Sequence, residues 1–397
     1  MKKLWLLLLI LPALHTSCST YRTVKYMESG SVSPEAFVVK IPFEYRLGLV
    51  ILKVTLQGKE YDFLLDSGAP NSISKALADK LGFTKDFDRK VGDSQGSSGQ
   101  LGFTMIDKMS LGGVEFSDQG AVIIDMKSQE LLSCLHVDGL VGANLMRTVV
   151  WKIDYQHQEI TLSNSLAALK LPPPAHKIPF TTSVTGSPYV QLDLNGVTVD
   201  RVLLDLGSSS GFKLSYDVLD NLEKDDPKIA KTYGYGSQSF GLYGLGKKDT
   251  TFFIKAADCK IGEQPIAENI IRFPSATKRS IGTQFFKQYD LVFDWFKKEV
   301  MFFSRNLEKA TLSNFGFYCL KQDNRLVVSF VYENANQVKI GDVILRIGTE
   351  NLENFTVDKW CEKLENGYFD QDAKEISITI ERDGVTQDLT LKRMDLL

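Results

Sequence analysis

The sequence predicts a mainly β protein in which two homologous β-rich lobes precede a small α+β domain. Stretches such as "VILKVTLQG" and "YVQLDLNG" alternate apolar and polar residues with a period of two, as half-buried strands do. A long pattern of strands and glycines occurs twice along the chain. After residue 305 the pattern changes and ends in "ISITIERDGVTQDLTL", which predicts a hairpin around an Asp-Gly turn.

The composition is that of a globular protein. The chain has 397 residues, of which 43% are hydrophobic and 24% are charged. This length suits two or three domains of roughly 150 residues each. The net charge is −3 and no basic block occurs, so we expect no nucleic-acid partner.

The N-terminus predicts export. Two lysines precede the apolar run 4–14, which is shorter than the roughly 20 residues that a membrane-spanning helix needs. The run leads to "LHTSC", and Cys18 resembles a bacterial lipoprotein cleavage site, although His15 stands where such sites usually carry leucine. We expect residues 1–18 to be a lipoprotein-type signal peptide. The mature chain would then lie in the cell envelope, facing the periplasm or the cell surface and anchored to the membrane through lipid on Cys18. Ordinary signal cleavage with an inert Cys18 is the alternative.

Each repeat begins with "KIPF" and continues with two strands joined by a short turn at Gly58 or Gly196. The second strand ends in "FLLD" in the first repeat and in "VLLD" in the second, and such apolar runs suit strands that are buried on both faces. A buried carboxylate costs free energy unless it is paired or used. Asp66 and Asp205, at the ends of these runs, are therefore candidate functional residues.

The repeats also agree in their later parts. "GLVGANLM" in the first repeat matches "SIGTQFF" in the second, so that Gly142 corresponds to Gly282, with glycine-rich strands before each. This predicts two lobes, at residues 36–165 and 174–305, joined by the proline-rich linker "LKLPPPAHK".

Together these motifs resemble the bilobal aspartic proteases with retropepsin-like, pepsin-type lobes. "LLDSGAPNS" is a close match to the first family motif and "LLDLGSSSG" is a looser one. The resemblance implies that Asp66 and Asp205 face each other and share a proton. The charged member would activate a water and the protonated member would polarise the scissile carbonyl of a peptide or protein substrate. No metal or other cofactor is expected.

The residues beside the two acids differ between the motifs. In the family, a hydroxyl after each acid joins a network that locks the two loops together; Ser67 supplies one, but Leu206 stands at the other place. Ser208 stands where a hydroxyl often bonds the outer carboxylate oxygen, with a plain turn role as the alternative for both serines. Gly68 and Gly207 complete the two motifs as supporting residues.

The second motif also contains a G-x-S-x-G pattern around Ser209. A serine hydrolase of that type needs a histidine later in the chain, but His176 is the last histidine. The sequence also lacks an H-E-x-x-H motif, which argues against a zinc hydrolase.

The cysteines beyond the signal segment show no C-x-x-C spacing. Such spacing would indicate a zinc site or a redox pair, and a domain of this size does not need disulfides. We therefore expect buried free thiols at Cys134, Cys259, Cys319 and Cys361.

The C-terminal stretch "VKIGDVILRIG", with "YENANQ" before it, resembles a PDZ domain, at residues 313–397. The resemblance implies that the backbone amides of Gly316 and Phe317 hold the C-terminal carboxylate of a peptide ligand. Residues 355–364 would form the helix beside the groove, and a peptide would add to the sheet edge. The domain would recruit or gate substrate; alternatively it only packs against the lobes.

The sequence thus predicts an exported aspartic endopeptidase. Two alternatives stay open. Because Leu206 departs from the family pattern, the lobes could form a peptide-binding protein that has lost hydrolysis. The protein could also be an envelope scaffold that uses the C-terminal domain alone.

Overall fold

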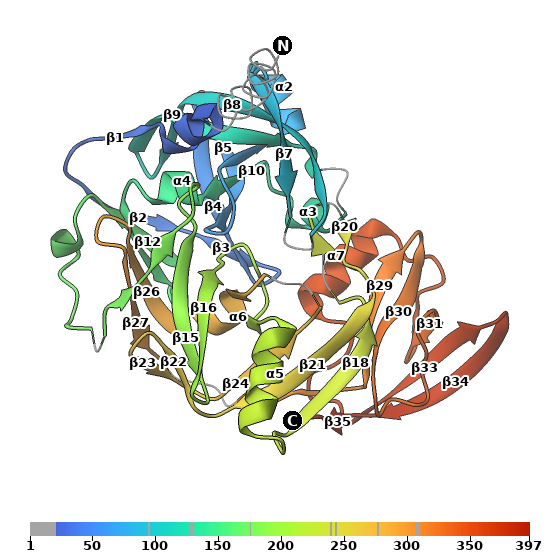
Figure 1. The fold of residues 1–397 in the computed structure, drawn as a ribbon. Helices are drawn as coiled ribbons and strands as arrows, with labels where there is room; N and C mark the ends of the chain where they lie inside the picture. The colour runs from blue at the N-terminus through green and yellow to red at the C-terminus, as the bar shows by residue number, and fades with distance from the viewer. Residues whose placement is uncertain are drawn as a thin grey trace, which may run out of the picture.

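The computed structural model describes residues 21–93, 96–126, 130–174, 176–238, 240–242, 244–275, 278–305 and 310–397. Within them the chain is mainly β, which confirms the predicted fold class at this level (Figure 1). The predicted signal peptide and Cys18 lie outside the described residues. In the part of the chain that is described, no helix is long and apolar enough to cross a membrane.

The first sheet is built around the hairpin of β4 (Leu49–Leu56) and β5 (Lys59–Asp66). Its predicted turn lies at Gln57-Gly58, where φ is 48° and 76°, so that glycine avoids the strain of the left-handed region. β10 (Gly139–Gly142) runs parallel to β5. The other strands of this sheet are β1 (Ser31–Ser33), β3 (Glu44–Arg46), β6 (Ser72–Ser74), β7 (Phe87–Gly92), β8 (Ser98–Leu111) and β9 (Val114–Ile124).

A second sheet contains a matching group of strands. β15 (Pro188–Leu194) and β16 (Val197–Leu204) form a hairpin with its turn at Asn195-Gly196, and β25 (Ser280–Ile281) runs parallel to β16. The sheet continues through β14 (Thr181–Thr182), β17 (Phe212–Lys213), β18 (Lys231–Gly236), β21 (Asp249–Ala256), β22 (Cys259–Ile261), β23 (Gln264–Ile266) and β24 (Asn269–Phe273). In the chain, a small hairpin of β19 (Phe240–Gly241) and β20 (Gly244–Leu245) connects β18 to β21.

A third sheet joins the two halves of the chain. β11 (Val150–Asp154) from the first half pairs with β26 (Tyr289–Asp294) from the second. β2 (Val38–Pro42), β12 (Glu159–Ser163), β13 (Ile178–Pro179) and β27 (Glu299–Ser304) complete the sheet. A single apolar cluster spans this sheet and both halves, and Trp151, Leu204 and Phe293 are fully buried in it.

The C-terminal region extends the second sheet. β30 (Arg325–Tyr332) pairs with β18, so that Gly234 lies opposite Tyr332. The strands beyond are β29 (Phe317–Gln322), β31 (Val343–Ile347), β32 (Glu350–Asn351), β33 (Glu375–Arg382) and β34 (Val385–Lys392), while β28 (Ser313–Asn314) pairs with β35 (Met394–Asp395). The β33–β34 hairpin turns at Asp383-Gly384, as predicted.

Helices occupy the connections between the strands. The longer ones are α2 (Lys75–Leu81), α5 (Tyr216–Asp225) and α7 (Val357–Asn366). The shorter ones are α3 (Glu130–Leu135), α4 (Ala143–Met146), α6 (Thr283–Phe286) and the 3-10 helix η2 (Leu166–Leu169).

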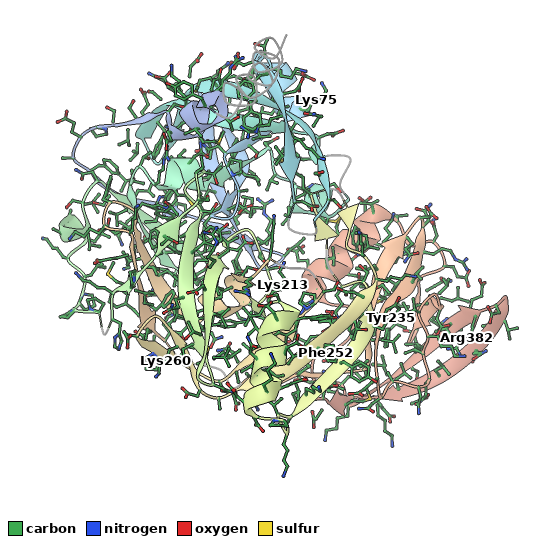
Figure 2. All side chains as sticks on the ribbon, in the orientation of Figure 1. Lys75, Lys213, Tyr235, Phe252, Lys260 and Arg382 are labelled. Carbon is green, nitrogen blue, oxygen red and sulfur yellow. A yellow bond between two sulfur atoms is a disulfide. The ribbon has the colours of Figure 1, made fainter. Side chains whose placement is uncertain are left out.

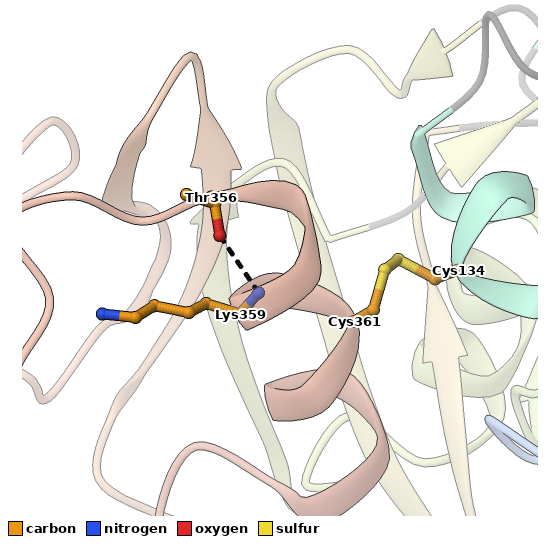
Figure 3. Close-up of a disulfide and its surroundings, with 4 residues drawn as sticks. All are labelled: Cys134, Thr356, Lys359 and Cys361. Atoms are coloured by element: carbon orange, nitrogen blue, oxygen red, sulfur yellow. Dashed lines mark hydrogen bonds between the residues drawn. A yellow bond between two sulfur atoms is a disulfide. The ribbon is translucent and has the colours of Figure 1, made fainter.

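One disulfide corrects the expectation of four free thiols. Cys134 on α3 is bonded to Cys361 on α7, with 5.1 Å between their Cα atoms (Figure 3). That separation is in the ordinary range for a disulfide. The two residues are 227 positions apart, so the absence of C-x-x-C spacing could not reveal this pair. Cys259 and Cys319 are buried free thiols, as predicted.

Candidate active site

Asp66 is the last residue of β5 and directly follows the fully buried Leu65 in the chain. The chain turns at once, and the backbone N–H of Gly68 donates to Asp66 Oδ1 over 2.8 Å. β5 is held between β4 and β10, and in the β10 pairing Asp66 lies opposite Gly142. A strand paired on both sides therefore fixes this half-buried carboxylate.

Asp205 occupies the equivalent place in the second half. It follows β16 directly, and its backbone N–H donates to the carbonyl of Ile281 over 2.9 Å. The N–H of Gly207 donates to Asp205 Oδ1 over 3.1 Å, as that of Gly68 does to Asp66. Both carboxylates thus sit in the same kind of turn.

The structure brings the two acids together across the junction of the two halves. A Cβ atom added to Gly68 would lie 2.8 Å from Asp205 Oδ1, and one added to Gly207 would lie 2.2 Å from Asp66 Cγ. Each carboxylate therefore packs against the glycine of the opposite loop. This mutual approach explains why both motifs carry glycine two residues after the acid.

Ser67 crosses between the loops. Its hydroxyl donates to the carbonyl of Leu204 over 2.6 Å and accepts from the N–H of Leu206 over 2.9 Å. Leu206 is fully buried in the main apolar cluster and has no hydroxyl to return the bond. The polar link between the loops is therefore made from one side, and apolar packing of Leu206 supports the other.

Ser208 shapes the second loop. Its hydroxyl lies 2.8 Å from that of Ser210, and its carbonyl accepts from the N–H of Thr283 over 2.8 Å. Within the described residues no hydrogen bond joins the Ser208 hydroxyl to Asp205. These contacts fit a plain turn role for Ser208.

The sequence did not predict the role of two buried asparagines, Asn71 and Asn144, which support the first loop. The Asn144 side chain accepts from the N–H of Asn71 over 2.6 Å, and Asn71 Oδ1 accepts from the N–H of Gly142 over 2.8 Å. A Cβ on Gly142 would lie 2.1 Å from the carbonyl carbon of Pro70, so this glycine lets the strand pass directly behind the loop. The motif "GLVGAN" signalled the close approach, but no local pattern indicated that the asparagines would pair.

The two carboxylates differ electrostatically. Burial, and then the nearby charge of Asp205, raise the pKa of Asp66 to about 7. Burial also raises the pKa of Asp205, but the positive charges of Lys213 and Lys278 oppose that rise. The positive charges near Asp205 therefore favour the shared proton on Asp66 and the negative charge on Asp205.

The pair can consequently supply an acid and a base at one point. Two carboxylates that lie close together cannot both ionise readily, so they retain one proton between them over a range of pH. The ionised oxygen can accept a proton from a water, while the protonated one can donate to a carbonyl oxygen. This chemistry needs only these two side chains and a water.

In the predicted carboxylate loop of the C-terminal region, the Gly316 N–H already has an internal acceptor. Gly316 has a φ of 87°, and its N–H donates to Asn314 Oδ1 over 2.7 Å. Phe317 begins β29, pairs with Val331 of β30, and is 2% exposed. The predicted helix at 355–364 corresponds to α7, which begins two residues later.

Part of the first half of the chain matches a known protein family. Residues 52–145, which include Asp66 and Gly142, match the aspartyl protease family. No curated protein matches the chain. The family match thus supports an aspartic-type peptidase and covers the first of the two motifs.

Proposed function

We propose that this protein is an aspartic endopeptidase whose catalytic residues are Asp66 and Asp205. The observation that carries the proposal is the packing of each carboxylate against the glycine of the opposite loop. The family match around Asp66 supports the reaction type. The matching strand pairings behind Asp205 support an equivalent role for the second acid.

In this mechanism Asp205 accepts a proton from a water held between the two carboxylates. Asp66 donates its proton to the carbonyl oxygen of the scissile peptide bond as the water attacks the carbonyl carbon. The tetrahedral intermediate then collapses, and the leaving nitrogen takes a proton from the pair. No covalent bond to the protein forms at any step.

We further propose that the two halves are homologous lobes and that the C-terminal region is a PDZ-like domain that gates the cleft. Pairing between β18 and β30 favours gating over recruitment, because it attaches this domain directly to a strand of the half that carries Asp205. The bond from the Gly316 N–H to Asn314 competes with capture of a peptide carboxylate there.

The proposed location is the cell envelope, with a lipid anchor on Cys18. The disulfide supports export, because such bonds persist outside the reducing cytosol. Membrane fractionation of cells that express the parent and Cys18→Ser tests the anchor. Equal release of both forms into the soluble fraction would remove it.

Turnover of a peptide library across pH tests the activity. Asp66→Asn and Asp205→Asn should each lower turnover by a factor of about 10³ or more, because either change removes the shared proton. Asp107→Asn, at an exposed place on β8, is the matched control and should behave as the parent does. Full turnover by Asp205→Asn would overturn the pair.

A binding protein without hydrolysis is the second candidate, and Leu206 is the observation that favours it. This side chain leaves the polar link between the loops one-sided. Peptide binding by the parent without turnover at any pH would support this candidate over the enzyme.

A further inference from the structure

Two cationic side chains share a face of the second sheet with Asp205. Lys213 of β17 lies opposite Arg272 of β24 and opposite Ser280 of β25. Ser280 in turn lies opposite Leu203, two residues before Asp205. Because residues in register share a face and alternate residues of a strand do too, Lys213 and Arg272 project on the side of the sheet that carries Asp205.

Neither cation, Lys213 or Arg272, has a carboxylate within ion-pair distance among the described residues. Arg272 Nη2 donates to Gln238 Oε1 over 2.6 Å, but Arg272 Nε and Gln238 Nε2 are buried with no hydrogen-bond partner among the described residues. Buried donors without acceptors are rare and cost free energy. This group of side chains therefore offers N–H donors that a carboxylate would satisfy.

The first half of the chain provides an internal comparison. In the first half, Leu64 lies two residues before Asp66 and opposite Leu140, so these two residues correspond to Leu203 and Ser280. Leu140 also lies opposite Ser72. Ser72 lies opposite Val122. Ser72 and Val122 thus occupy the places of Lys213 and Arg272 and carry no charge. The strand arrangement does not require cations here, so their presence on the Asp205 side alone calls for another reason.

The location also fits a substrate subsite. Figure 2 shows Lys213 near the centre of the molecule. Lys278, just before β25, donates to the carbonyl of Asp93 beyond β7 over 2.6 Å, so the end of the β7–β8 hairpin reaches the same region. Lys213 and Lys278 are also close enough to Asp205 to lower its pKa against the effect of burial. Among the described residues, the acids whose charges act on Lys213 are Asp205 and Asp93. The Asp93 carboxylate accepts the N–H of Ser97 over 2.8 Å.

We propose that Lys213 and Arg272 bind a carboxylate of the substrate on the Asp205 side of the cleft. The substrate would be a peptide with an aspartate or glutamate near the scissile bond, or one whose free C-terminal carboxylate lies there. A guanidinium and an ammonium together suit a carboxylate, with the guanidinium giving direction to the contact. This inference rests on the proposed function.

Matched peptides test the subsite. One series changes a single glutamate near the scissile bond to glutamine, and a second series compares a free with an amidated C-terminus. We expect kcat/KM of the parent to be about tenfold higher or more for one carboxylate-bearing member, since a charged hydrogen bond is worth roughly that factor. Arg272→Gln and Lys213→Met should bring this ratio towards one, and Arg272→Lys should restore part of it. Lys260→Met is the matched control, because Lys260 is exposed and lies away from Lys213 (Figure 2).

Equal turnover of all matched peptides by the parent would overturn the subsite, as would an unchanged ratio in both subsite variants. Binding of the same peptides to Asp66→Asn separates this result from the proposed function. Tighter binding of the carboxylate-bearing peptide, lost when Arg272→Gln is added, would support the subsite even if no peptide is cleaved. Equal binding of the matched peptides to Asp66→Asn would contradict it.

Discussion

Asp66 and Asp205 end equivalent strands, yet their surroundings differ at the scale of single residues. Lys213 and Lys278 lie near Asp205, whereas beside Asp66 the uncharged Ser72 occupies the place of Lys213. The nearby positive charges therefore favour the negative charge on Asp205 and the proton on Asp66. The asymmetry that the sequence shows at Leu206 thus extends to the electrostatics of the pair.

The raised pKa of Asp66 predicts a pH-dependent stability. Its pKa is about 7 in the folded protein and near 3.8 in the unfolded chain, so between these values the folded state holds a proton that the unfolded state has released. The contribution to stability is fully present below about pH 4 and is lost as pH rises through about 7. Asp66→Asn should remove this loss and raise the free energy of unfolding at pH 8 by up to about 4 kcal/mol relative to the parent.

Urea unfolding of both proteins at pH 4 and pH 8 measures this difference. Asp107→Asn is the control, and it should follow the parent at both pH values. If the curves of Asp66→Asn and the parent shift in parallel between pH 4 and pH 8, Asp66 does not carry the raised pKa.

Residue patterns predicted only part of this site. The apolar run before each acid indicated Asp66 and Asp205, because the cost of burying a carboxylate is visible in the sequence. The crossing bonds of Ser67 follow from its place after the first acid. The Asn71–Asn144 contact and the Lys213–Arg272 pairing each join segments that are distant in the chain, and no local spacing records such contacts.

At the scale of elements, the disulfide ties α7 to the support of Asp66. α3, which carries Cys134, leads after a short connection into β10, and β10 runs parallel to the strand that ends in Asp66. Figure 3 shows α7 opposite α3, with Thr356 accepting a hydrogen bond from the Lys359 N–H at the start of α7. The C-terminal helix is thus covalently linked to a segment next to the proposed active site.

Removing this link should lower stability. A cross-link between residues 227 apart restricts the unfolded chain, and the chain-entropy relation gives up to about 5 kcal/mol for a loop of that length. The double variant Cys134→Ser, Cys361→Ser should therefore unfold at a lower urea concentration than the parent. A thiol reductant should destabilise the parent by a similar amount and leave the double variant unchanged. A parent that resists reductant, with no cross-linked peptide in a non-reducing digest, would show that the bond does not form.

At the scale of the whole molecule, two strand pairings connect the two halves and the C-terminal region. The β11–β26 pairing joins the two halves, and the β18–β30 pairing joins the second half to the C-terminal region. The hairpin turns at Gly58, Gly196 and Gly384 were predictable, because glycine marks all three and asparagine or aspartate precedes it in the last two. These two strand pairings were not predictable. The alternating pattern of a strand shows which of its faces is buried, but it does not show which distant strand it pairs with.

The β18–β30 pairing predicts that the C-terminal region is needed for full order in the half that carries Asp205. Deleting residues 313–397 removes β30 from the edge of β18 and uncovers Phe253, whose ring lies 5.4 Å from that of Tyr332. We expect faster hydrogen exchange over residues 231–256 in the truncated protein, unchanged exchange over residues 59–66, and peptide turnover reduced several-fold. A full-length protein cut at a protease site inserted between Ala310 and Thr311 is the control, because β18–β30 pairing and the Cys134–Cys361 bond still hold its two fragments together. If the cut and the truncated proteins lose turnover equally, chain continuity matters and the β18–β30 contact does not; if neither loses it, the C-terminal region does not gate the cleft.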